Sequence, residues 1–72
     1  MALYDDAVAV ASLYLGPAAK GFLSRQLNTL SIDVQALGRE HLEKLAERCL
    51  VSGKVFMDEA KATTFSQKIK AL

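Results

Sequence analysis

The stretch Leu15-Gly16-Pro17-Ala18-Ala19 decides the fold of this 72-residue chain, because it joins two segments that both have helical periodicity. Glycine suits the position that closes a helix, since it adopts a positive φ angle without a steric penalty. Proline suits the first turn of the next helix, where its missing N–H would have had no partner. The stretch therefore predicts a tight corner between two short helices that pack against each other.

The segment before the corner, which we expect to be a helix over residues 3–15, is apolar nearly all round. Asp5 and Asp6 lie in its first turn, where negative charge favours the helix dipole. A helix with so narrow a polar edge must be covered on most of its sides. One of its apolar stripes is therefore predicted to contact a partner, and Leu13 lies outside that stripe. The predicted interface residues are Tyr4, Val8, Ala11 and Leu15.

The segment after the corner predicts a second helix over residues 17–30, which buries its Phe and Leu side chains on one face. Residues 31–38 read as a connection that contains one helical turn. Ser31 is the expected cap of that turn and Gly38 its expected end.

The last half of the chain predicts two more helices. The third begins near Arg39, and Ser52-Gly53 leaves open whether it continues, kinks or breaks there. The fourth begins after Asp58, whose carboxylate can cap it. No segment alternates polar and apolar residues with period two, so no strand is expected. The sequence therefore predicts one all-α domain over residues 1–72, a small four-helix bundle with short connections.

Composition points away from several classes of function. Nine Lys and Arg against eight Asp and Glu give a net charge of +1, which exerts little pull on nucleic acid or anionic membranes. Cys49 is the only cysteine, so neither a disulfide nor a Cys/His zinc site is expected. The acidic pairs stand at expected helix starts, which accounts for them without a metal, and no cofactor is expected.

The residues that could carry chemistry lack the partners that chemistry needs. His41, the only histidine, has no neighbouring nucleophile or second titrating group in the sequence pattern, so we expect a surface residue. Cys49 lies among apolar positions of the third helix, where a cysteine behaves as a small buried hydrophobe. We therefore do not expect an enzyme.

The pattern of the N-terminal apolar run does not match that of an export signal. No basic region precedes it, Asp5 and Asp6 interrupt it, and the run from Ala7 to Leu15 is too short to span a bilayer. A lone thiol fits a reducing compartment. These features predict a cytoplasmic location.

The corner also carries a resemblance to a known group of proteins. The pattern Leu15-Gly16-Pro17-Ala18-Ala19, followed by Phe22-Leu23, His41-Leu42 and Asp58-Glu59-Ala60-Lys61, runs over most of the chain. It resembles small helical modules with a Gly-Pro corner in bacterial signalling proteins, appended to kinase, receiver or roadblock-type domains. The resemblance implies a regulatory or interaction unit.

Two functions from different classes follow. The leading prediction is a non-enzymatic interaction module that pairs with itself as a homodimer, or with another protein, through the first helix. The alternative is a weak nucleic-acid-binding domain, in which lysines of the last helix contact phosphates. The lysines of that alternative are Lys61, Lys68 and Lys70.

Overall fold

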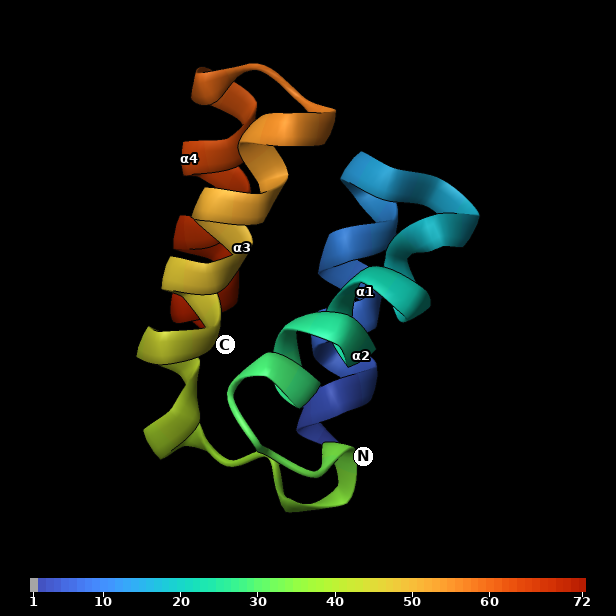
Figure 1. Cartoon of the computed structure of the whole chain (residues 1–72), viewed down its shortest axis with the longest axis vertical. Helices are drawn as coiled ribbons and strands as arrows, with labels where there is room; N and C mark the ends of the chain where they lie inside the picture. The colour runs from blue at the N-terminus through green and yellow to red at the C-terminus, as the bar shows by residue number, and fades with distance from the viewer. Residues whose placement is uncertain (1) are drawn as a thin grey trace.

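The computed structural model describes residues 2–72, and these are helical with no strand (Figure 1). The prediction of an all-α chain is therefore confirmed. The α-helices are α1 (Leu3–Leu15), α2 (Ala19–Thr29), α3 (Leu42–Phe56) and α4 (Glu59–Lys70). Three short 3-10 turns accompany them: η1 (Gly16–Ala18), η2 (Val34–Ala36) and η3 (Arg39–His41).

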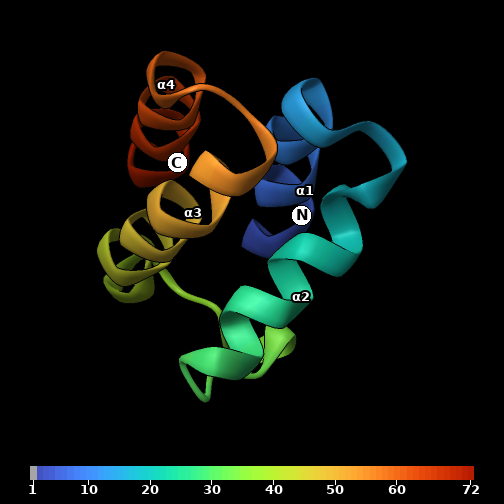
Figure 2. The same cartoon turned by 45° about the horizontal axis from the view of Figure 1, so that its top comes forward.

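The helices form two pairs that lie beside each other. Figure 1 shows α1 paired with α2 and α3 paired with α4, and Figure 2 shows the same pairs from a second direction. Because η1 joins α1 to α2 without a non-helical residue, residues 3–29 form one bent helical stretch. The predicted bundle of four separate helices is therefore not confirmed, because α1 and α2 are parts of one bent helical stretch.

The bend lies at the predicted corner. Gly16 has a φ of 57°, and its N–H donates to the carbonyl of Ser12, as expected for a residue that closes a helix. Pro17 lies in the 3-10 turn that follows. The hydroxyl of Tyr4 lies 3.0 Å from that of Ser24, 20 residues along the chain. In a straight helix these residues would be about 30 Å apart, so α2 folds back along α1.

The same bent stretch, Leu3–Thr29, is long and apolar enough to cross a membrane by length and composition alone. This helical stretch is longer than the apolar run from Ala7 to Leu15, which by itself is too short to span a bilayer. Core helices and N-terminal signal sequences have the same properties. In the structure the stretch is folded back at Gly16 instead of being straight.

Gly16→Ala is expected to lower the free energy of unfolding by about 1 kcal/mol or more. An added Cβ would meet no other atom within 4 Å, so the cost comes from the positive φ angle alone. Urea unfolding followed by circular dichroism measures this loss, and Pro17→Ala is the matched control with the smaller expected effect. An unchanged or higher midpoint for Gly16→Ala would contradict the assigned backbone strain.

The core lies between the two helix pairs and is centred on Phe65 of α4. Its ring centroid is 5.2 Å from that of Tyr14 on α1 and 5.9 Å from that of Phe22 on α2. Phe65 and its helical neighbours Ala62 and Ile69 are fully buried. These contacts link three helices, so α4 stabilises the packing of the first pair.

The connection between α2 and α3 differs from its prediction. Asp33, not Ser31, caps the turn: its carboxylate accepts a hydrogen bond from the Gln35 N–H at 2.9 Å. Ser31 instead has a φ of 59° and reverses the chain after α2. Gly38 does not end the turn but precedes η3, where its N–H donates to Nδ1 of His41. Both expected roles were wrong because the turn, Val34–Ala36, begins three residues after Ser31 and is followed by Leu37 before Gly38 is reached.

The structure of the second helix pair shows what happens at Ser52-Gly53, where the sequence left open whether the helix continues, kinks or breaks. α3 continues through both residues to Phe56, and Gly53 lies buried against α4. The predicted cap of α4 is confirmed, since the Lys61 N–H donates to the Asp58 carboxylate at 2.8 Å. The turn between α3 and α4 is therefore short, and it leaves the last turn of α3 at one end of the molecule (Figure 1).

Candidate interaction surface

The interface predicted on α1 lies mostly inside the fold. Ala11 is fully buried and cannot contact a partner, so its assignment was wrong. Tyr4, Val8 and Leu15 are partly buried and pack against the core, and the Tyr4 hydroxyl lies within hydrogen-bond distance of Ser24. The reason is that α1 is covered by α2 and α4 of the same chain.

The large apolar side chains that remain exposed belong to other positions. Val55 is 80% exposed, Leu13 73%, Phe56 63% and Val51 55%. Leu13 lies on α1 but outside the predicted stripe. The others lie on the last two turns of α3, where the sequence left the helix uncertain. A continuous helix would have placed Val51 and Val55 on a face separate from the buried Cys49, which is the signal that could have found them.

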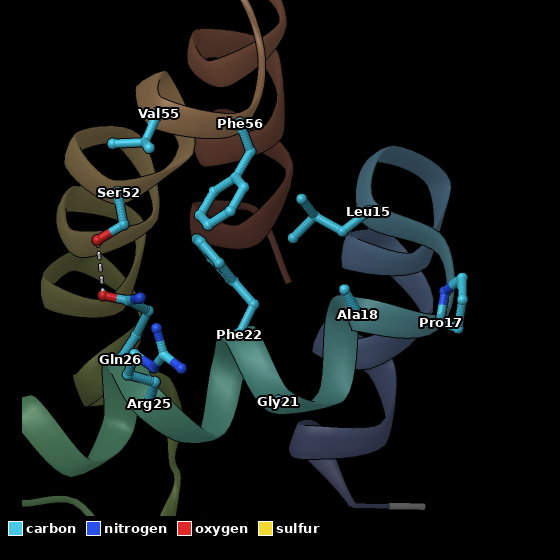
Figure 3. A pocket seen from close by; sticks show the side chains of 10 residues that line it. All are labelled: Leu15, Pro17, Ala18, Gly21, Phe22, Arg25, Gln26, Ser52, Val55 and Phe56. Atoms are coloured by element: carbon cyan, nitrogen blue, oxygen red, sulfur yellow. Dashed lines mark hydrogen bonds between the residues drawn. The ribbon is translucent and has the colours of Figure 1, made fainter.

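A groove of about 650 Å³ lies between α2 and the end of α3 (Figure 3). Phe22 and Phe56 meet edge to face across it, with ring centroids 5.8 Å apart. Figure 3 also shows Leu15 pointing toward Phe56 from the corner. The walls are mostly apolar, which suits an apolar occupant. The lining residues are Leu15, Pro17, Ala18, Gly21, Phe22, Arg25, Gln26, Ser52, Val55 and Phe56.

The polar groups of the groove are gathered at one end. The Ser52 hydroxyl donates to the side-chain carbonyl of Gln26 at 3.0 Å and accepts from Arg48 at 3.5 Å. Gln26 is buried, so this bond satisfies a side chain that burial would otherwise penalise. Arg25 is exposed and supplies a positive charge at the same end. The groove thus offers apolar contact along its length and one guanidinium at its edge.

A second, smaller hollow of about 310 Å³ lies on the other side of Phe56. Its lining residues are Leu13, Tyr14, Phe56, Met57, Asp58 and Lys61. Phe56 borders both hollows and is mostly exposed, so its ring separates one hollow from the other. We call the exposed side chains Leu13, Val51, Val55 and Phe56, together with the groove, the Phe56 surface.

The lysines of the alternative prediction do not form one surface. Lys61, Lys68 and Lys70 are all exposed on α4. Lys61 and Lys68 share a side of the helix, and the Lys68 ammonium lies 5.6 Å from the Tyr14 ring centroid. Lys70 points about 200° away from Lys68, given the helical rotation per residue. A phosphate backbone would therefore meet two of these lysines at most.

Cys49 and His41, the two side chains that could carry chemistry, take part in the packing or the hydrogen bonding of the fold. Cys49 is fully buried, and burial raises the pKa of its thiol to about 12, against a smaller lowering by the Arg48 charge. His41 accepts a hydrogen bond from the Gly38 N–H at 3.0 Å. Among residues 2–72, no group of three or more His, Cys, Asp or Glu side chains could hold a metal ion.

Comparisons of this chain with protein-family models, curated proteins and solved structures found no significant match. The resemblance to helical modules of bacterial signalling proteins therefore stays a prediction from the residues of the corner.

Proposed function

We propose that this chain is a non-enzymatic protein-interaction module that associates with itself as a homodimer, and that the Phe56 surface is its contact. The observation that carries the proposal is the gathering of exposed Val55 and Phe56 beside an apolar groove. Scattered single apolar residues on a surface are ordinary, whereas apolar residues that border a groove mark binding sites.

The energetics support this choice of surface. Burying one Val or Phe side chain contributes about 1.5–3 kcal/mol, and a two-fold dimer buries each residue of the contact twice. Phe56 is already held edge to face by Phe22, so its ring loses little freedom on binding. An aromatic anchor next to a pocket is typical of residues that dominate binding energy.

Phe56→Asp is expected to convert the dimer to a monomer, because a carboxylate in the centre of an apolar contact carries a large desolvation cost. Phe56 is exposed in the last turn of α3, so the monomer should keep its fold. Sedimentation velocity over a range of concentrations measures the mass, and circular dichroism checks the helix content.

The matched control is Gln35→Asp, which adds the same charge at an exposed position of η2, away from the groove. This variant should associate as the unchanged chain does. A chain that stays monomeric at millimolar concentration, or a Phe56→Asp variant that still dimerises, would overturn the proposal.

A further inference from the structure

We infer a specific two-fold register for this association, which rests on the proposed self-association: the outer ridge of α3 in one copy fills the groove of the other copy. The ridge consists of Glu47, Val51 and Val55, which follow one another at intervals of four residues and are all exposed. Residues at this spacing lie on one side of a helix, so the ridge is a single stripe.

The groove has a matching stripe on α2 and the turn before it. Pro17, Gly21 and Arg25 are exposed, line the groove and follow one another at the same interval of four. Both stripes therefore span about 12 Å of helix. The two stripes are equal in length, and Val55, the last residue of the ridge, also lines the groove.

Gly21 is the residue that makes room in the middle of the groove. A glycine inside a helix costs about 0.5–1 kcal/mol relative to alanine. Nothing inside the chain accounts for it, since an added Cβ would meet no atom within 4 Å. The open space above Gly21 faces the groove and gives the middle residue of a ridge, Val51, a place to pack.

Charge selects the direction of the ridge in the groove. With Val51 of one copy over Gly21 of the other, Glu47 falls at one end and Val55 at the other. Arg25 stands at the polar end of the groove, and Pro17 and Leu15 at the apolar end. Placing Glu47 beside Arg25 puts Val55 against the apolar end, so the charged and apolar contacts agree on one direction.

Two-fold symmetry makes this contact occur twice. In such a dimer, if Glu47 of one copy meets Arg25 of its partner, the reverse pair forms as well. Ridge and groove lie on one face of the chain, since Val55 belongs to both. The contact therefore closes on itself, and α2 and α3 of the two copies together surround the symmetry axis.

Charge reversal tests the register. Arg25→Glu alone would place two like-charge pairs in the homodimer, and Glu47→Arg alone would do the same. Each variant should raise the dimer dissociation constant by about tenfold or more at low salt, with a smaller effect at high salt. An equimolar mixture of the two variants should restore association. In the mixed dimer one contact joins the two substituted side chains and the other joins the unchanged Glu47 and Arg25, so both contacts pair opposite charges.

The matched control is Glu59→Arg, the same charge change at an exposed position of α4 that lines neither hollow, which should leave the dissociation constant unchanged. Sedimentation equilibrium of the single variants, the mixture and the control measures all four values. A dimer of the unchanged chain whose single variants associate normally, or whose mixture stays dissociated, would overturn the register while leaving self-association intact. A monomeric unchanged chain would overturn both.

Discussion

Phe65→Ala is expected to lower the free energy of unfolding by about 3–5 kcal/mol. Phe65 is fully buried, and its ring contacts those of Tyr14 and Phe22. Truncation removes the transfer free energy of the ring and leaves a cavity where helices of both pairs meet. A domain of this size has a total stability of only about 4–11 kcal/mol, so this loss would remove a large share of the free energy of unfolding.

Urea unfolding at low protein concentration measures this loss without a contribution from association. Phe56→Ala is the matched control, because it removes the same ring from a position that is 63% exposed. We expect Phe56→Ala to weaken association more than folding, and Phe65→Ala to do the reverse. Equal losses of stability in the two variants would contradict the position of Phe65 at the centre of the core.

Alkaline pH is expected to destabilise the fold through Cys49. Burial raises the pKa of this thiol from 9.0 to about 12 in the folded chain. Between these values the unfolded chain loses the proton and the folded chain keeps it, so ionisation favours unfolding as the pH rises. The contribution of the neutral thiol is complete below pH 9 and falls by about 1.4 kcal/mol per pH unit above it.

Cys49→Val isolates the thiol, because lysines and tyrosines titrate in both chains. Between about pH 7.5 and about pH 10.5 the unchanged chain should lose about 2 kcal/mol more unfolding free energy than the valine variant. Urea midpoints at the two pH values give this difference. Parallel pH dependences in the two chains would show that the thiol is hydrated in the folded state.

Features set by neighbouring residues could be read from the sequence. The corner at Gly16-Pro17 and the cap at Asp58 both appear where they were predicted. A positive φ angle and a capping hydrogen bond depend on a few consecutive residues, so the sequence contains what determines them. The predicted start and end of α1 agree with the structure for the same reason, whereas α2 and α3 begin two to three residues later than predicted, after the 3-10 turns η1 and η3.

Features set by packing could not be read in this way. Ala11 and Leu13 are two residues apart on the same apolar helix, yet one is fully buried and the other 73% exposed. Helical periodicity groups apolar residues into faces, but only the arrangement of the other helices decides which face is covered. The continuation of α3 through Gly53 is likewise tied to its contact with α4.

The candidate site belongs to this second class. Phe22 and Phe56 lie 34 residues apart in the chain and meet across the groove only because the two helix pairs lie side by side. By itself the sequence determined the all-helical character, the extent of α1, the corner and the cap of α4, because each depends on local backbone energetics. Tertiary structure alone decided that α2 and α4 of the same chain cover α1 and that the Phe56 surface is exposed, because burial depends on contacts between residues distant in sequence.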